Sequence, residues 1–168
     1  MLTVYNGGDM LSQATQAMKA KENQQLRDLG FKVWSPQEDT EINDKQKQTE
    51  ESNNGLAEKI FEHDTLGIEQ ADIIIFEVSN NNVGTTAEVG QMAQLNRINN
   101  SCNDRNHGDK RFFFQSYDIR RTTIPEKGDR RSWGINQYLY GAILSLNPKG
   151  IQTWDEIIEE LKGLRDEH

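Results

Sequence analysis

The sequence predicts a three-layer α/β domain with a parallel sheet of four or five strands. Short β-prone segments alternate with longer segments of helical periodicity along the 168 residues. Residues 73–76 form an unbroken apolar run, which is typical of a central parallel strand buried on both faces. Because crossovers between parallel strands are right-handed as a rule, this alternation indicates one sheet with helices on both sides. The length suits a single domain over residues 1–168.

Each element has its own local signal. Gly30 ends the first helix, Pro36 stops the second strand, and Thr153 with Glu156 has the capping-box spacing that begins the last helix. Residues 37–54 are almost wholly polar, and we expect a mobile loop there, with a partly helical lid as the alternative. We expect strands over residues 2–5, 31–34, 72–78 and 111–116, and helices over residues 10–29, 56–70, 85–97, 133–146 and 153–164.

The first helix carries apolar residues that predict its buried face, namely Leu11, Ala14, Met18, Leu26 and Leu29. Together the elements describe a flavodoxin-like (Rossmann-like) arrangement. In open parallel sheets, ligands bind outside the carboxyl ends of the strands. Function is therefore sought in the segments that follow the strands, which are residues 6–9, 35–38, 79–88 and 116–121.

Composition excludes several classes of function. The formal net charge is −8, and acidic residues are spread over the whole length, which argues against a nucleic-acid partner. The longest apolar run is far below a membrane span and no secretory signal is seen, so we expect no membrane association and a cytoplasmic location. Cys102 has no patterned catalytic partner, and the three histidines lack ligand spacing. We therefore expect neither a metal nor a cofactor.

Glu88 is the strongest candidate for chemistry in the predicted binding edge. It follows the loop after the central strand, and we expect it in the first turn of a helix, whose positive end favours an ionised carboxylate. Gly84 permits close approach of the backbone to a ligand. The structural alternative is a capping box, in which Glu88 only bonds back to the amide of Thr85. A phosphate-cradling loop is disfavoured because no Gly-x-Gly-x-x-Gly or Gly-Lys-Thr arrangement is present.

Four motifs occur in order over residues 2–100. They are Val4-Tyr5-Asn6-Gly7-Gly8, Asp64 within residues 61–68, Ala71-Asp72-Ile73-Ile74-Ile75-Phe76, and Asn82-Val83-Gly84-Thr85-Thr86-Ala87-Glu88-Val89-Gly90. Ser132-Trp133-Gly134 follows further along the chain. In their order and separation these motifs resemble the nucleoside 2-deoxyribosyltransferase family.

The resemblance implies an enzyme in which Glu88 attacks C1′ of a 2′-deoxynucleoside and a second free nucleobase opens the resulting ester, with retention of configuration. Asp64 matches a family carboxylate that assists protonation of the leaving base, and Tyr5 matches a tyrosine that orients the nucleophile. Gly7, Gly8, Asn82 and Gly84 would contact the substrate. The structural alternative is that Tyr5 is only a buried tyrosine at the end of a strand and that Asp64 is only an aspartate on the surface of a helix.

The chain departs from the family pattern at two places. Asn82 stands where well-known members carry an aspartate, which puts base preference in doubt. Those members complete each site with a polar residue of a neighbouring subunit, so the resemblance implies a homo-oligomer with shared sites, and Asp129 is the closest match, with Asn136 as a weaker one. Here the chain continues through a helix instead of ending in a short tail that reaches the site.

Two other functions stay open at the level of sequence. A hydrolase of 2′-deoxynucleosides or their 5′-monophosphates would use the same Glu88 intermediate and let water open it, and the pairs Arg120-Arg121 and Arg130-Arg131 could hold a phosphate. A non-catalytic nucleotide-binding module on the same fold is the second alternative, because fold alone does not determine function.

Overall fold

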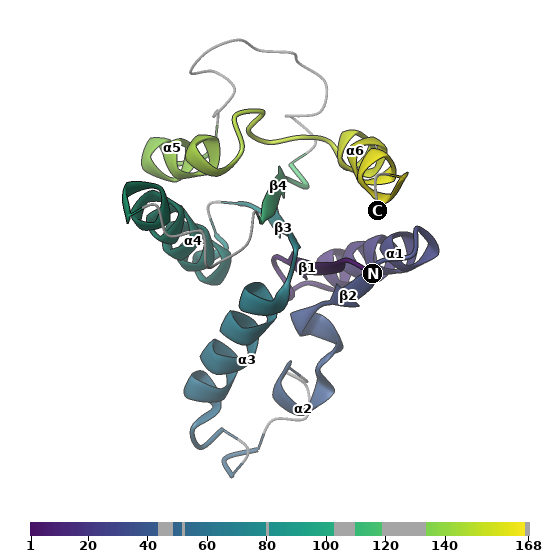
Figure 1. Ribbon diagram of the computed structural model, residues 1–168. Helices are drawn as coiled ribbons and strands as arrows, with labels where there is room; N and C mark the ends of the chain where they lie inside the picture. Colours follow the sequence, from purple (N-terminus) through teal and green to yellow (C-terminus); the bar gives the residue numbers. More distant parts are fainter. Residues whose placement is uncertain (44–48, 52, 80, 103–109, 119–133, 167–168) are drawn as a thin grey trace.

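The computed structural model describes residues 1–43, 49–51, 53–79, 81–102, 110–118 and 134–166 (Figure 1). Its centre is a four-stranded, wholly parallel sheet with the order β2-β1-β3-β4, which is the order of a flavodoxin-like fold. An isolated parallel bridge between Phe114 and Ile151 continues the pairing beyond β4. The strands are β1 (Thr3–Gly7), β2 (Lys32–Trp34), β3 (Ile73–Glu77) and β4 (Arg111–Gln115).

Helices cover both faces of the sheet, so the predicted three-layer α/β class is confirmed (Figure 1). Helices α3, α4 and α5 lie against one face, and α1 and α6 lie against the other. Within the described residues, none of the helices has both the length and the apolarity needed to cross a bilayer. The helical elements are α1 (Gln13–Asp28), η1 (Pro36–Glu38), α2 (Thr40–Asn43), α3 (Leu56–Gln70), α4 (Val83–Cys102), α5 (Gln137–Leu146) and α6 (Trp154–Asp166).

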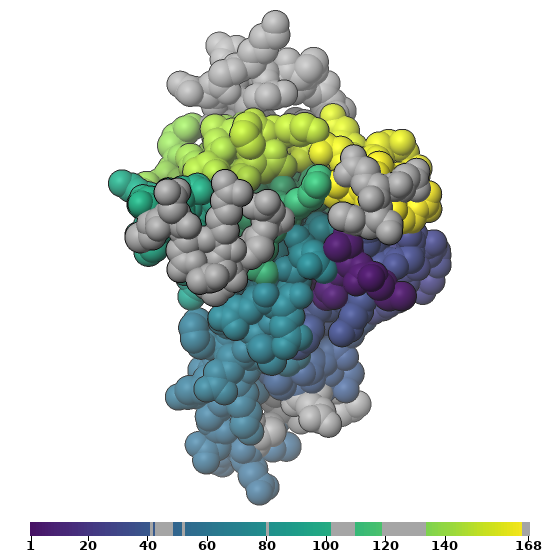
Figure 2. All heavy atoms as spheres, in the orientation of Figure 1, coloured from purple at the N-terminus to yellow at the C-terminus, as the bar shows by residue number. Residues whose placement is uncertain are grey.

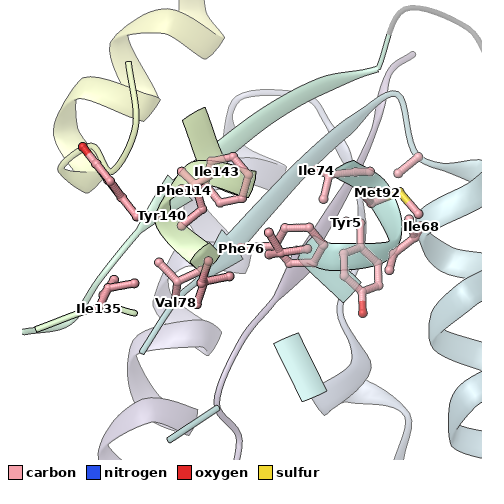
Figure 3. Packing of buried hydrophobic residues seen from close by; sticks show 13 residues of the cluster. Tyr5, Ile68, Ile74, Phe76, Val78, Met92, Phe114, Ile135, Tyr140 and Ile143 are labelled. Carbon is pink, nitrogen blue, oxygen red and sulfur yellow. The ribbon is translucent and has the colours of Figure 1, made fainter. Parts of the chain in front are cut away.

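The two cores follow from the alternation of side chains along the strands. On the α3–α4–α5 side, Tyr5 and Phe76 pack edge to face at 6.0 Å, and Phe76 lies 6.1 Å from Phe114 (Figure 3). On the other side, neighbouring residues of the same strands pack against α1 and α6, among them Val4 and Ile75. The run over residues 73–76 is fully buried because each of its faces meets a helical layer, as the sequence predicts.

Several boundaries differ from those expected. Helix α1 begins at Gln13 rather than at residue 10, because Ser12 and Thr15 form a capping box there. The predicted box of Thr153 and Glu156 is confirmed at the start of α6. Between residues 37 and 43 the chain contains η1 and α2, so the partly helical alternative describes that part better than a loop. Figure 2 shows this segment, with the first turns of α3, extending from the body of the domain.

The buried face of α1 is only partly the predicted one. Leu26 is fully buried and Leu29 packs against the core, as expected. Ala14 and Met18 are exposed, the latter at 43% of its surface, and Leu11 lies just before the helix with 82% exposed. Lys19 and Glu22 face the sheet instead, each with 1% exposed. The apolar pattern fails here because this face of α1 meets polar side chains at the carboxyl ends of the strands.

Candidate active site

The candidate catalytic residues meet where the strand order of the sheet reverses. In flavodoxin-like sheets this switch point lies between β1 and β3, and ligands bind outside the carboxyl ends of those strands. Tyr5 stands on β1, Glu88 on α4 immediately after β3, and Asp64 on α3 immediately before β3. Chain topology thus brings together three residues that lie as much as 83 positions apart in sequence.

Tyr5 and Glu88 are joined directly. The Tyr5 hydroxyl donates a hydrogen bond of 2.8 Å to Oε1 of Glu88. The ring of Tyr5 is fully buried within the apolar cluster, and its hydroxyl points out of that cluster (Figure 3). Burial raises the pKa of Tyr5 well above its usual value, and the nearby Glu88 and Asp64 carboxylates raise it further. The phenol therefore remains protonated and acts as a donor to Glu88.

The environment of Glu88 makes its carboxylate easy to protonate. Burial is the largest cause and raises the pKa of Glu88 to about 7, and the negative charge of Asp64 acts in the same direction. The hydrogen bond from Tyr5 and the charge of Lys19 lower that pKa and so favour the ionised form. Desolvation therefore outweighs the two interactions that favour the ionised form.

The start of α4 decides against the capping alternative. Helix α4 begins at Val83, earlier than expected, because the side-chain oxygen of Asn82 accepts a hydrogen bond of 3.2 Å from the amide of Thr85. Glu88 consequently lies in the second turn, not the first. Its carboxylate turns to Tyr5, while Asn82 satisfies the amide that the predicted capping box assigned to Glu88. A residue that is not needed to cap the helix is available for chemistry.

The predicted glycines behave differently from one another. A Cβ on Gly7 would lie 2.7 Å from Cε1 of Tyr5, and one on Gly8 would lie 2.7 Å from Cβ of Glu77 and 2.8 Å from Cε of Lys19. Neither position has room for a side chain. Gly84, at the start of α4, has open space instead, with the nearest atom of Asn82 at 4.0 Å. The glycines after β1 therefore allow close packing beneath the site, and Gly84 leaves space at its edge.

Asp64 lies close enough to Tyr5 and Glu88 to raise the pKa of both. Its side chain is 15% exposed, and Oδ1 lies 3.1 Å from Nδ1 of His63. The other ring nitrogen of His63 lies 3.0 Å from Oδ2 of Asp39, in the segment between η1 and α2. Neither His63 nor Asp39 was predicted from the sequence as a site residue.

The remaining predicted site residues take no part in the Tyr5–Glu88 hydrogen bond. Nδ2 of Asn82 is buried and has no hydrogen-bond partner within the described residues. Asn136 is exposed and caps α5, with its side-chain oxygen 2.9 Å from the amide of Tyr138. Asp129 and the two arginine pairs over residues 120–121 and 130–131 lie outside the described residues.

A buried polar network under Gly7 and Gly8 is the main feature that the sequence analysis missed. Nζ of Lys19 lies 2.8 Å from Oδ1 of Asn6 and 3.2 Å from Oε2 of Glu22. The other oxygen of Glu22 accepts hydrogen bonds from Gln115 and Tyr117, at 2.9 and 3.0 Å. The network thereby joins α1 to the carboxyl ends of β1 and β4. Lys19, Glu22 and Leu26 recur at helical spacing, a signal that is visible once polar residues are allowed on an inner face.

Among the residues that the structure describes, the carboxylates of this network outnumber its cations. Burial lowers the pKa of Lys19, and the neighbouring Glu22, Glu77 and Glu88 carboxylates oppose that effect. Burial also raises the pKa of Glu77, which is 3% exposed. Lys19 is the cation that these carboxylates share, and its positive charge also lowers the pKa of Glu88. Among the described residues, no group of three or more His, Cys, Asp or Glu side chains is arranged to hold a metal ion.

Comparison with known families agrees with this geometry. The family model described as "Nucleoside 2-deoxyribosyltransferase" matches residues 4–111, which is more than half of the chain and includes Tyr5, Asp64 and Glu88. The chain belongs to the nucleoside 2-deoxyribosyltransferase family. It is accordingly an enzyme with nucleoside deoxyribosyltransferase activity, as the resemblance in the sequence implies.

Solved structures give the same fold for this deoxyribosyltransferase. The chain is similar to the 2-deoxyribosyltransferase from the psychrotolerant bacterium Bacillus psychrosaccharolyticus, with a TM-score of 0.58 and 20% sequence identity. The match covers 93% of this chain and 90% of the other, so it extends over the helices that follow the family match. No curated protein sequence matches the chain.

The contact between Tyr5 and Glu88 leads to a first prediction. Replacing Tyr5 with Phe removes a hydrogen bond that lowers the Glu88 pKa, so that pKa rises above about 7. Since a hydrogen bond to a charged group is worth about 1.5–3 kcal/mol, activity at pH 7 should fall about 10- to 100-fold. The acid limb of the pH profile of kcat/KM should also move to higher pH, because more enzyme carries a protonated Glu88.

The matched control is Tyr138→Phe, which removes a hydroxyl from a tyrosine with 89% of its surface exposed on α5. We expect an unchanged profile for that variant. A Tyr5→Phe variant that loses activity equally at every pH would show that the hydroxyl does not act through the ionisation of Glu88.

Proposed function

We propose that this deoxyribosyltransferase transfers 2-deoxyribose between nucleobases through a covalent ester on Glu88, with retention of configuration at C1′. The observation that carries the proposal is the Tyr5–Glu88 hydrogen bond of 2.8 Å at the switch point of the sheet. The proposal is supported by a partly buried carboxylate that is held by a donor near the edge where α/β sheets bind ligands. Asp64 supplies the second carboxyl group that glycosyl transfer requires.

The first half of the reaction forms the ester. An oxygen of ionised Glu88 attacks C1′, the bond from C1′ to the base nitrogen breaks, and its electron pair stays on the base. Asp64 delivers a proton to the departing base, which makes it a better leaving group. Tyr5 keeps the attacking carboxylate oriented. Because Glu88 is largely buried, its carboxylate has fewer hydrogen bonds to water when it attacks than it would have in solution.

The second half reverses these roles. A nitrogen of the incoming nucleobase attacks C1′, the ester bond breaks, and Glu88 is released as a carboxylate. The proton of the incoming base passes to Asp64, which restores the starting state. Two displacements at the same carbon invert it twice, so the product retains the configuration of the substrate. Water in place of the base would give free deoxyribose.

The substrates we propose are a 2′-deoxynucleoside and a free nucleobase. Gly84 would border the sugar because open space lies beside it. Gly7 and Gly8 would contact the sugar through their backbone, because protein side chains already occupy the space that a side chain would fill there. The unpaired, buried Nδ2 of Asn82 would donate to the base. No cofactor takes part in these two displacements.

We further propose a homo-oligomer in which a neighbouring subunit completes each site. Asn136 at the start of α5 is exposed, and Val83 at the start of α4 has 77% of its surface exposed. Asp129 would contribute in the same way. A cytoplasmic location, where deoxynucleosides and bases are salvaged, accords with this role. Activity that persisted unchanged in a proven monomer would contradict the sharing of sites.

The test is incubation with a 2′-deoxynucleoside, with and without a different free base, followed by chromatography. We expect a new deoxynucleoside when the second base is present. Free base and deoxyribose alone would mean a hydrolase, and no change under either condition would mean a non-catalytic module. Mass spectrometry of enzyme quenched without acceptor should find one deoxyribosyl group on the peptide that contains Glu88. Anomeric analysis of the product by NMR tests retention.

A further inference from the structure

His63 contacts a carboxylate with each of its two ring nitrogens. Nδ1 lies 3.1 Å from Oδ1 of Asp64, and Nε2 lies 3.0 Å from Oδ2 of Asp39. An ionised carboxylate only accepts hydrogen bonds, and a neutral imidazole has a single N–H. Both contacts are hydrogen bonds only if the three groups together hold two protons. Those protons make an imidazolium between two carboxylates, or a neutral imidazole beside one carboxylic acid.

The ring of His63 is held in this position by packing. It lies 5.1 Å from the ring of Trp34, tilted by 43°. Trp34 in turn lies against Gly67 one turn further along α3, where an added Cβ would be 2.5 Å from Nε1 of Trp34. The side chain of His63 is 22% exposed, so water reaches it while the orientation stays constrained. The two contacts are therefore a built arrangement rather than a chance meeting of surface charges.

We propose that His63 is a positioning residue that orients Asp64 and keeps a proton available for the departing nucleobase, with Asp39 stabilising that proton from the other side. The inference rests on the proposed function, in which Asp64 protonates the base. It answers a chemical difficulty of that function. Asp64 lies beside Glu88 and must be protonated at the moment when Glu88 is ionised.

The proton balance is simple. As the bond from C1′ to the base nitrogen breaks, its electron pair stays on that nitrogen. The nitrogen then accepts a proton from Asp64, which is one of the two protons of the Asp39–His63–Asp64 group. The bond from Glu88 to C1′ forms in the same step. The group is left with one proton, shared by neutral His63 and its carboxylates. When the incoming base attacks C1′, its N–H proton returns to Asp64 and the group regains two protons.

Titratable groups from four elements meet around His63 and Asp64. Asp64 lies beside His63 on α3, and Asp39 belongs to the segment between η1 and α2. Glu88 on α4 and Tyr5 on β1 act through Asp64. Replacing Asp39 with Asn removes the carboxylate that contacts Nε2 of His63, and we expect it to slow cleavage of an ordinary substrate more than that of an activated one.

The first experiment compares leaving bases that differ in their need for a proton. The pair is 2′-deoxyguanosine with its 7-methyl derivative, or 2′-deoxyuridine with its 5-fluoro derivative, whichever pair the wild-type enzyme cleaves. His63→Gln keeps a hydrogen-bonding side chain that cannot supply a proton. We expect it to slow cleavage of the ordinary substrate about 10²-fold or more, as general acid catalysis does, and that of the activated substrate by much less. His63→Phe, which keeps a ring against Trp34, should give the same selectivity.

The matched control is Glu62→Gln, an exposed neighbour on α3, which should leave both rates unchanged. Nitrogen-15 NMR of the His63 ring in the free enzyme gives a readout independent of catalysis: both ring nitrogens should show the chemical shifts of hydrogen-bonded nitrogens, and Asp39→Asn should change that of Nε2. Equal loss on both substrates in the two His63 variants and in Asp39→Asn would overturn the proposal. A wild-type enzyme that cleaves no deoxynucleoside would instead overturn the proposed function, and this inference with it.

Discussion

Replacing Glu88 with Gln is expected to abolish base exchange, with kcat/KM falling by at least about 10³-fold. An amide oxygen is a poor nucleophile, so no deoxyribosyl ester forms and the mass-labelled peptide disappears. The substitution keeps the shape of the side chain and its ability to accept the hydrogen bond of 2.8 Å from Tyr5. Loss of activity therefore reports the loss of the carboxylate rather than a rearranged site. A variant that retained more than about a tenth of wild-type activity would exclude Glu88 as nucleophile.

The same substitution should stabilise the folded protein at alkaline pH. The pKa of Glu88 is raised from 4.5 to about 7 in the folded state, so ionising it there costs free energy that the unfolded chain does not pay. The cost is absent below the unfolded pKa, grows between that value and about 7, and is constant above it. At about 1.4 kcal/mol per pKa unit, Glu88→Gln should raise the free energy of unfolding at pH 8 by about 1–3 kcal/mol.

Denaturant unfolding at pH 8 and pH 4.5 checks this. The gain should be present at the first pH and vanish at the second, and the exposed control Glu62→Gln should change neither. An equal change at both pH values would mean that the variant acts through packing. Activity lost together with stability gained is the pattern expected of a carboxylate that is retained for chemistry.

The sequence predicts the layers of this fold better than it predicts the inner face of one helix. The run over residues 73–76 is buried on both faces, and its apolar character alone indicates a central strand. Tyr5, Asp64 and Glu88 could be predicted as partners because they match family motifs in order, and the structure places them together. The local spacing of Glu88 fits both a catalytic carboxylate and a capping box. Only the hydrogen bond of Asn82 at the start of α4 distinguishes the two.

What could not be predicted depends on contacts between distant segments. Hydrophobic periodicity places Leu11 and Met18 inside and leaves Lys19 out, and the structure has the reverse. The reason is that Gln115 and the other polar strand ends offer hydrogen-bond partners to this face of α1, more than 90 residues away in sequence. The contact of His63 with Asp39 is equally invisible, since nothing in the polar stretch after β2 marks Asp39 as a partner. A buried or bridging role of a polar residue can therefore be predicted only once the residues that it contacts in the fold are known.

Lys19→Met is expected to have the largest effect on stability of any change considered. It leaves Glu22, which is 1% exposed, and Glu77, which is 3% exposed, without their shared cation in a buried setting. Breaking a buried ion pair by removing one partner costs about 3–5 kcal/mol, because an uncompensated charge stays behind. Denaturant unfolding at pH 7 should show that loss. Lys21→Met, an exposed lysine on the same helix, should cost almost nothing.

A second substitution distinguishes loss of charge balance from loss of packing. Adding Glu22→Gln to Lys19→Met removes the main unpaired carboxylate and keeps an acceptor for Gln115 and Tyr117, so it should recover part of the lost stability. Catalysis supplies a second readout, because the charge of Lys19 lowers the Glu88 pKa. In the double variant, the acid limb of kcat/KM should therefore stay shifted to higher pH although stability has partly returned. Equal unfolding free energies for Lys19→Met and Lys21→Met would contradict the role of Lys19 as the shared cation beneath the site.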